Sequence, residues 1–204
     1  MRKIIFITLL SIFLCSEVYG IEINFHNQKG NVSTQYTEQE SLARAMYAQN
    51  NLDETLNILY SIPESGRSAE DWLIIGNILQ DKGDTKTAIS MYENAVATDK
   101  KFYKAYYNLG VLYFNEEKYA LALSNFKNAK KYKLDNPNIY YNLGCTYINL
   151  GEFRKAKNEI MYAIELKNNV PEYYYNIAYA YKKIGKDKKA QNYMELYDNL
   201  IKNQ

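Results

Sequence analysis

The chain has 204 residues and a formal net charge of +2, a balance too weak to indicate a nucleic-acid partner. It contains one histidine and two cysteines, which excludes a metal site built from several His and Cys ligands within one subunit. The single histidine, His26, lies in a polar lead-in segment, so a nucleophile–histidine–carboxylate triad is not expected either. The sequence therefore predicts no catalytic residue, no metal ligand and no cofactor.

The N-terminus has the pattern of an export signal. Arg2 and Lys3 precede an apolar run over residues 4–14. The run is shorter than the roughly 20 residues needed to span a bilayer. It predicts a secretory signal peptide over residues 1–20, with cleavage after Gly20 and a periplasmic or secreted mature protein. An uncleaved signal that tethers the chain to the membrane is an alternative.

A second alternative for this segment is lipidation. Cys15 ends the apolar run, as the modified cysteine of a lipoprotein would. Leu14 before it is bulkier than the small residue that lipoprotein processing usually requires, so lipidation of Cys15 is the minority interpretation. Residues 21–35 are polar and are expected to form a flexible linker. After cleavage only Cys145 would remain, which leaves no intramolecular disulfide.

The rest of the chain repeats itself. Three glycines recur every 34 residues, each four positions after an aromatic residue: Gly76 after Trp72, Gly110 after Tyr106 and Gly144 after Tyr140. A period of this length is typical of a helix–turn–helix unit that buries its apolar face only by stacking on its neighbours. Within a unit, apolar residues follow the i, i+3, i+4, i+7 spacing of one helix face.

The best unit shows the full pattern: Tyr106, Leu109, Gly110, Tyr113, Tyr119, Ala122, Phe126 and Ala129. This pattern resembles the tetratricopeptide repeat (TPR) family. The resemblance covers four full units, at residues 69–102, 103–136, 137–170 and 171–204, and a degenerate unit at 36–68 with Thr55 where alanine is usual. It implies an all-α, right-handed superhelical solenoid, and the Asn-, Lys-, Ile- and Tyr-rich composition is typical of a bacterium with an AT-rich genome.

Glycine inside a helix costs roughly 1 kcal/mol relative to alanine. The recurrence of glycine therefore predicts that a second helix approaches closely there, opposite Ala88, Ala122 and Ala156. Turns are expected at Gly83, Gly151 and Gly185, with Asn115-Glu116-Glu117 replacing the glycine in one unit.

Tyrosine is unusually abundant, at 22 residues. Seven tyrosines occupy family positions that pack between helices and are expected in the core: Tyr106, Tyr113, Tyr119, Tyr140, Tyr147, Tyr174 and Tyr181. Others are expected on the concave surface: Tyr107, Tyr141, Tyr175 and Tyr179.

A column of asparagines accompanies these tyrosines, at Asn108, Asn142 and Asn176. The resemblance implies that such a column lines the inner surface and hydrogen-bonds the main chain of a bound peptide. An amide offers both a donor and an acceptor, which suits an extended backbone of any sequence. The alternative is that these asparagines bond only to neighbouring repeats.

One family activity can be tested on the residues. Repeats that capture acidic chaperone C-termini use a two-carboxylate clamp of Lys, Asn, Asn, Lys and Arg. The matching positions here are Leu73, Asn77, Asn108, Asn138 and Asn142. Both clamp asparagines are present but all three cations are missing, which argues against this activity.

Charge is unevenly distributed along the repeats. Units 36–68 and 69–102 carry −3 and −2, whereas units 103–136, 137–170 and 171–204 carry +3, +1 and +2. Such an asymmetry can bias the orientation of an encounter and permits head-to-tail self-association. Ordinary solvated helix faces explain it equally well.

The predicted function is that of an exported, non-catalytic scaffold that binds an extended peptide or a helix of another envelope protein in a Tyr/Asn-lined groove. The alternative is a structural, self-assembling repeat protein of the cell envelope. Nucleic-acid binding through tyrosine stacking is disfavoured by the export signal and the weak charge. An enzyme is disfavoured because the repeats leave no segment in which reactive groups converge.

Overall fold

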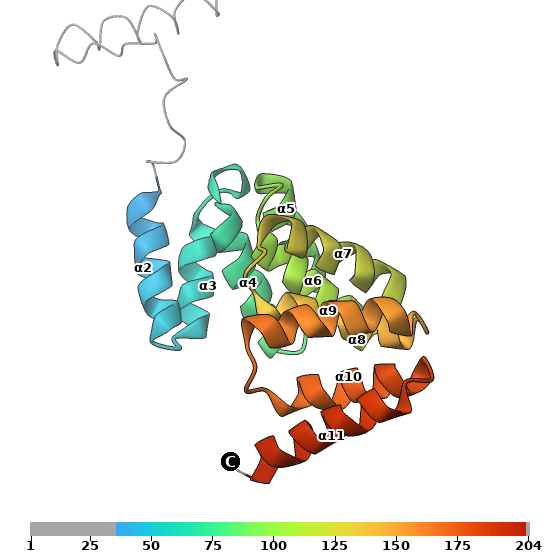
Figure 1. Ribbon diagram of the computed structural model, residues 1–204. Coiled ribbons are helices and arrows are strands. Elements are labelled where there is room, and N and C mark those ends of the chain that lie inside the picture. Colours follow the sequence, from blue (N-terminus) through green and yellow to red (C-terminus); the bar gives the residue numbers. More distant parts are fainter. Residues whose placement is uncertain (1–35, 203–204) are drawn as a thin grey trace, which may run out of the picture. The chain divides into compact units, whose positions relative to one another are not determined.

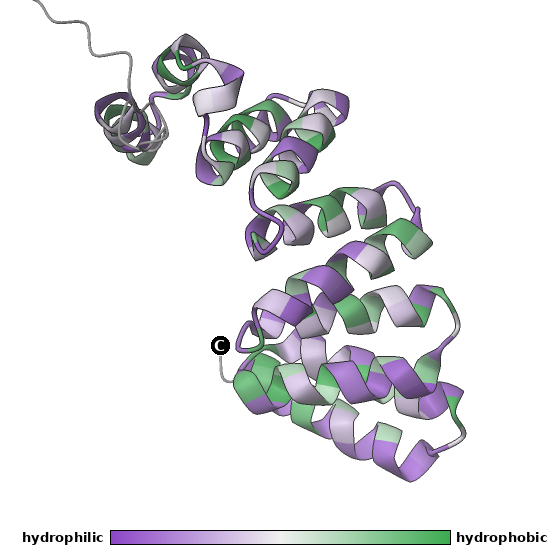
Figure 2. Ribbon diagram, turned by 90° about the horizontal axis from the view of Figure 1, so that it is seen from above, coloured by the Kyte–Doolittle hydropathy of each residue, from purple (hydrophilic) through white to green (hydrophobic). Residues whose placement is uncertain are grey.

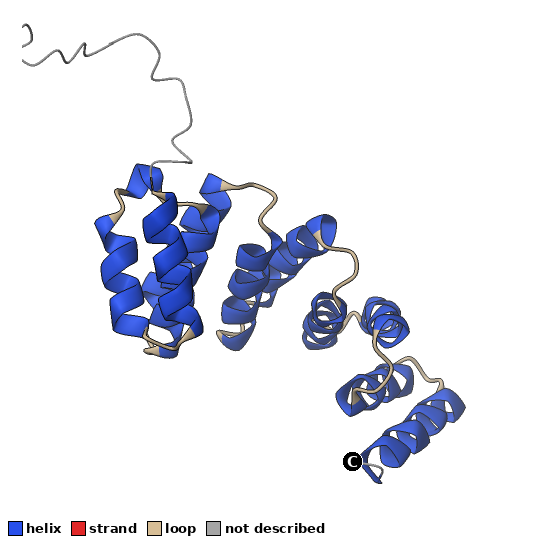
Figure 3. Ribbon diagram, turned by 90° about the vertical axis from the view of Figure 1, so that its left-hand side faces the viewer, coloured by secondary structure: helices blue, strands red, loops and turns tan. Residues whose placement is uncertain are grey.

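The computed structural model describes residues 36–202. The predicted signal peptide, Cys15, His26 and the predicted linker lie outside the described residues. Within residues 36–202 the chain forms ten α-helices and one short 3-10 helix, and no strand (Figures 1 and 3). The helical part of the fold prediction is confirmed for this region.

The helices follow one another in regular pairs. They are α2 (Thr37–Ala48), α3 (Leu52–Ser61), the 3-10 turn η2 (Glu64–Gly66), α4 (Ala69–Asp81), α5 (Thr85–Thr98), α6 (Tyr103–Asn115), α7 (Tyr119–Tyr132), α8 (Pro137–Asn149), α9 (Phe153–Leu166), α10 (Pro171–Lys183) and α11 (Asp187–Lys202). In each pair the first helix packs along the second, and the second helix contacts the first helix of the next pair. Hydrophobic and hydrophilic residues alternate around these helices, as expected for elements that bury one side (Figure 2).

Local signals set where several helices begin. Ser68 caps α4, and it forms a reciprocal capping box with Asp71. Pro137 and Pro171 occupy the first turn of α8 and α10, where a missing backbone N–H leaves no hydrogen bond unmade.

The turns between paired helices use the left-handed backbone region. Gly83, Gly151 and Gly185 have φ values of +84°, +75° and +72°, which glycine adopts without steric cost. In two units a residue with a side chain takes this conformation instead, namely Asn50 at 61° and Glu117 at 59°.

Paired helices approach closely at the glycines, as predicted, but the nearest side chains come one helical turn after the predicted alanines. At Gly144 the predicted partner is also in reach, because a built Cβ would lie 3.3 Å from the carbonyl oxygen of Ala156. A Cβ built on Gly110 would lie 2.6 Å from the ring of Phe126. A Cβ on Gly144 would likewise collide with Ile160. The alanines are fully buried nearby, but the long side chain four residues later spans the gap and lies over the glycine.

Tyrosines fill much of the core, although not all as predicted. Tyr140, Tyr147, Tyr174 and Tyr181 are buried, whereas Tyr106, Tyr113 and Tyr119 are half-buried. Tyr92 and Tyr173 are the largest fully buried side chains. In the degenerate first unit, Ala43, Thr55 and Leu59 are fully buried, but Leu42 is half exposed.

The last helix differs from the helices that occupy the same place in earlier pairs. Ala95, Ala129 and Ala163 are fully buried, and each is followed by another helix pair. The matching residue of α11 is Tyr197, which is only partly buried and whose ring lies 5.6 Å from that of Tyr175. In the three regular units that are followed by another helix pair, this position holds alanine, whereas the first unit has the fully buried Ile62 there.

Candidate functional site

The predicted site residues all lie on first helices of pairs. Tyr107 and Asn108 belong to α6, Tyr141 and Asn142 to α8, and Tyr175, Asn176 and Tyr179 to α10. The structure brings several of them into contact across successive repeats.

A repeated hydrogen bond joins these helices. Asn142 Nδ2 donates to the Tyr107 hydroxyl at 3.0 Å, and Asn176 Nδ2 donates to the Tyr141 hydroxyl at 2.8 Å. We call these four residues the Tyr–Asn row. Each bond connects residues 35 positions apart, so the row follows directly from the repeat.

Asn108 uses a different partner. Its Nδ2 donates to Asn77 Oδ1 at 2.9 Å, because the position that holds tyrosine in later units is Leu73 in the unit before it. The alternative in which the asparagines bond to neighbouring repeats is therefore observed, but it uses only part of each amide.

The side-chain oxygens of Asn142 and Asn176 have no hydrogen-bond partner among residues 36–202. In the same part of the chain, the only buried side-chain polar atom without a partner is Asp71 Oδ1. The two asparagine oxygens are therefore accessible to solvent. The inter-repeat bond fixes the amide and leaves its acceptor for another group.

The tyrosine rings are held by aromatic neighbours. The ring centroids of Tyr107 and Phe126 lie 5.9 Å apart, and those of Tyr141 and Tyr173 lie 4.7 Å apart. These contacts restrict the side chains before any ligand arrives, which lowers the entropy cost of binding.

The two tyrosines of α10 are more open. Tyr175 is 50% exposed and Tyr179 is 38% exposed, against half-buried Tyr107 and Tyr141. Tyr175 borders a pocket of about 330 Å³ together with Tyr141, Asn176 and Tyr197. It also borders a second pocket of about 410 Å³ between α10 and α11, which includes Tyr179.

Burial keeps the groups at this site neutral. It raises the pKa values of Tyr107 and Tyr141, so both hydroxyls stay protonated at neutral pH. Burial also raises the pKa of the Cys145 thiol to about 11. Cys145 is therefore a neutral thiol beside the row, with Asn176 Nδ2 3.6 Å from its sulfur, and not an activated nucleophile.

The structure adds residues that the concave-surface prediction did not include. Tyr47, Gln80 and Asp81 border a pocket of about 400 Å³ with Tyr107 and Asn108. Tyr47 comes from the degenerate first unit, whose step to the next unit is 33 residues instead of 34, so the asparagine and tyrosine columns do not extend to it.

Two further properties concern the described region as a whole. No helix within residues 36–202 combines the length and hydrophobicity required to cross a bilayer. The same region contains no group of three or more His, Cys, Asp or Glu side chains arranged to hold a metal ion.

A stack of helix pairs joined by a side-chain row on its first helices defines a helical-repeat protein. Family models agree with this class. A model described as tetratricopeptide repeat matches residues 103–136, 137–170 and 171–203, and a model described as TPR repeat matches residues 76–116. Together they cover more than half of the chain, which belongs to the tetratricopeptide repeat family, and its fold is the helical solenoid of that family.

Solved structures share this fold. MamA AMB-1 has a TM-score of 0.73 at 19% identity, over 83% of this chain and 93% of that chain. MamA MSR-1 has a TM-score of 0.70 at 21% identity, over 82% and 97% of the two chains. A MamA RS-1 double mutant has a TM-score of 0.74 at 16% identity, over 85% and 98%. No curated protein sequence matches the chain.

Proposed function

We propose that this chain is an exported, non-catalytic scaffold that binds an extended peptide or a helix of a partner protein. The binding surface is the concave side of the solenoid, lined by Asn108, Asn142, Asn176, Tyr107, Tyr141, Tyr175 and Tyr179. The observation that carries the proposal is the Tyr–Asn row, in which the amide is fixed by one bond while its oxygen stays accessible.

The chemistry of the row suits a main chain. Each free asparagine oxygen can accept a hydrogen bond from a peptide N–H, and the second amide hydrogen of Asn142 can be donated to a peptide carbonyl, whereas that of Asn176 faces the Cys145 sulfur. The tyrosine rings beside them offer apolar contact for side chains. Because the amides are already held, binding does not have to order them.

The proposal is tested by two sets of variants that break the same inter-repeat bonds. Asn142→Ala and Asn176→Ala remove the bond and the amide. Tyr107→Phe and Tyr141→Phe remove the bond but keep the amide, and so act as matched controls for the structural loss. The measurement is the affinity of each variant for a partner captured by crosslinking to the native protein.

If the amides contact the ligand, the asparagine variants lose about tenfold in affinity while the phenylalanine variants lose much less. Equal affinity in all four variants and the native protein would contradict the proposal. So would equal losses in both sets, since these would assign the row a purely structural role.

We also propose that the chain is exported, on the strength of the apolar run that follows Arg2 and Lys3. Mass spectrometry of the mature N-terminus distinguishes the alternatives. A first residue of Ile21 supports cleavage after Gly20, and a lipid on Cys15 supports an anchored form. An intact, unmodified N-terminus on protein from the cell interior would contradict export.

Self-assembly into a structural array is the second candidate function. It is favoured by the charge difference between the acidic units 36–102 and the basic units 103–204. The bulky Tyr197 at the place of a buried alanine disfavours stacking of a further copy on α11 in the manner of a repeat. Light scattering at low and high salt separates the two functions, because an assembly held by charge dissociates as salt rises.

A further inference from the structure

The pocket between α2, α4 and α6 brings together the amide oxygens of Asn77 and Gln80 around the hydroxyl of Tyr92. The Tyr92 hydroxyl lies 2.9 Å from Asn77 Oδ1 and 2.8 Å from Gln80 Oε1, but it carries a single proton. Asn77 Oδ1 also accepts from Asn108 Nδ2 at 2.9 Å. The Tyr92 proton can reach only one of the two amide oxygens at a time, so the other can accept from a further donor.

Asp81 adds a negative charge to this pocket. Its carboxylate is exposed, lines the pocket and forms no ion pair within residues 36–202. The neighbouring cation, Lys82, is held instead by Asp53 at 2.7 Å, and Lys104 of α6 is held by Glu70 at 3.0 Å. Among residues 36–202, no cation therefore neutralises Asp81.

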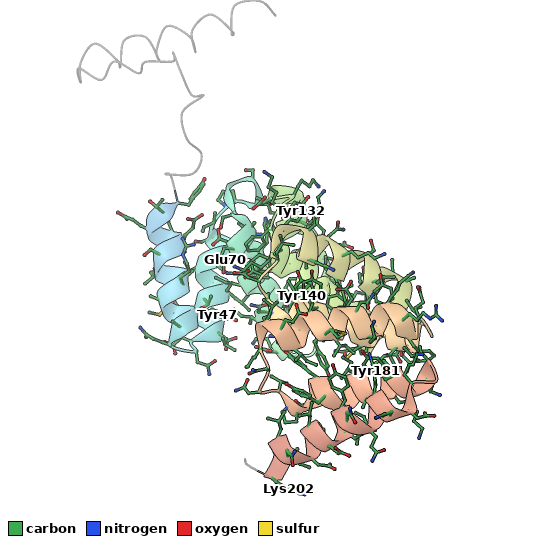
Figure 4. The ribbon with its side chains drawn as sticks, in the orientation of Figure 1. Tyr47, Glu70, Tyr132, Tyr140, Tyr181 and Lys202 are labelled. Atoms are coloured by element: carbon green, nitrogen blue, oxygen red, sulfur yellow. The ribbon has the colours of Figure 1, made fainter. Side chains whose placement is uncertain are left out.

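The surroundings reinforce the preference for positive charge. The two units that supply α2 and α4 carry −3 and −2. Burial, which is the largest effect, and the charge of Asp81 raise the pKa of Tyr92 to about 12, so its hydroxyl remains a neutral donor. Tyr47 and Tyr107 border the same space (Figure 4 labels Tyr47), and aromatic rings attract cations.

We propose that this pocket binds a basic side chain, arginine above all, of the extended chain that occupies the concave surface. A guanidinium carries five N–H donors in a planar fork, so it can meet the Asp81 carboxylate and an amide oxygen together and stack on a phenol ring. The inference rests on the proposed function, since it assigns charge selectivity to one end of the same surface.

A pocket near the other end of the array contains charges of both signs. Between α10 and α11, Lys182 and Asp187 line the same space, so opposite charges are present together. The neighbouring pocket of about 330 Å³ is lined by one acid, Glu172, and by no cation, so an acid beside the row is not confined to the start of the array.

The experiment uses the full chain and two labelled peptides of glycine, serine and alanine that differ at one central residue. One peptide carries arginine and the other citrulline, which has nearly the same shape but no charge. Their dissociation constants are measured by fluorescence anisotropy on the native protein, on Asp81→Asn and on Glu54→Gln. Glu54 is an exposed acid of the first unit outside the pocket, so its variant lowers the net negative charge equally.

We expect the native protein and Glu54→Gln to bind the arginine peptide about fivefold more tightly than the citrulline peptide. Asp81→Asn should reduce this preference to about twofold or less. Equal binding of the two peptides by the native protein overturns the inference, as does a preference that survives in Asp81→Asn or falls equally in Glu54→Gln.

Failure of both peptides to bind also overturns it. The wider proposal is judged separately, by the asparagine and phenylalanine variants and their affinity for the native partner. The proposal for the pocket can therefore be wrong while the proposed scaffold function is correct.

Discussion

The interior pair α8–α9 and the end pair α10–α11 share one repeat pattern but differ where a neighbour is present or absent. In α9, Ala163 and Ile160 are fully buried. The matching residues of α11, Tyr197 and Met194, are only partly buried. The repeat motif therefore sets the pairing of helices, whereas the residues at the contact between pairs depend on whether another pair follows.

The largest effect on stability is expected when the side chains at positions 163 and 197 are exchanged. Ala163→Tyr places the end residue under α10, where no space exists, and should lower the free energy of unfolding by about 3 kcal/mol. Tyr197→Ala at the open end removes a ring contact with Tyr175 and should cost about 1 kcal/mol. Chemical denaturation of the full chain measures both, and similar losses at the two positions would contradict the account.

The glycine contact gives a second test. Gly144→Ala gains about 1 kcal/mol of helix propensity but forces Ile160 to move, so we expect a net loss of about 1 kcal/mol. The end pair already combines Ala178 with Met194 at these positions. The double variant Gly144→Ala/Ile160→Met should therefore recover most of the loss, because methionine is unbranched and adapts to irregular space. An increase in stability for Gly144→Ala alone would show that the helices are not in close contact.

Removal of a hydrogen bond of the Tyr–Asn row is expected to have a smaller effect on the free energy of unfolding. Tyr141 accepts a bond from Asn176, whereas the hydroxyl of Tyr175 has no hydrogen bond within residues 36–202. Tyr141→Phe should lower the free energy of unfolding by about 1 kcal/mol, and Tyr175→Phe should leave it nearly unchanged. Equal effects in thermal or chemical denaturation would mean that the row does not couple successive repeats.

The smallest expected effect on stability concerns Glu40 on α2, in the first helix pair. Burial, and then the charge of Asp71, raise the pKa of Glu40 on α2 above its ordinary value of 4.5, although Arg44 lies 3.2 Å away. Because the Glu40 carboxyl has a higher pKa in the folded than in the unfolded state, its protonation stabilises the fold below pH 4.5. This stabilisation is lost as pH rises through the pKa of the folded state.

Glu40→Gln should therefore stabilise the chain by about 0.5 kcal/mol at neutral pH and flatten the pH dependence above 4.5. Glu38→Gln, an exposed change on the same helix, is the control. Hydrogen exchange in α2 as a function of pH measures the effect. An unchanged pH dependence in Glu40→Gln would contradict it.

Much of the fold could be predicted from the sequence because the 34-residue period fixes the helix pairs and their turns. The period does not say where a side chain points once it leaves its helix. For this reason the period predicts alanines opposite the glycines, whereas the nearest side chains, those of Tyr92, Phe126 and Ile160, come one turn later.

The site was predictable only in part for a related reason. The columns of Tyr107 and Asn142 follow from the repeat, but their mutual bond depends on which residue stands 35 positions earlier. The pocket around Asp81 also draws on Tyr47, from a unit that departs from the period. A repeat pattern predicts only residues that recur from unit to unit, whereas this pocket occurs once within residues 36–202.

Site-specific photocrosslinking at two exposed tyrosines tests whether the surface beside the Tyr–Asn row binds a partner protein. Tyr175 lies beside the row on α10 and is 50% exposed, and Tyr162 lies on α9 and is 55% exposed. Each is replaced in turn by p-benzoylphenylalanine, and the crosslinked partner segments are identified by mass spectrometry. We expect a defined partner segment to be crosslinked from position 175 and none from position 162. Equal crosslinking from both positions, or crosslinking from position 162 alone, would contradict it.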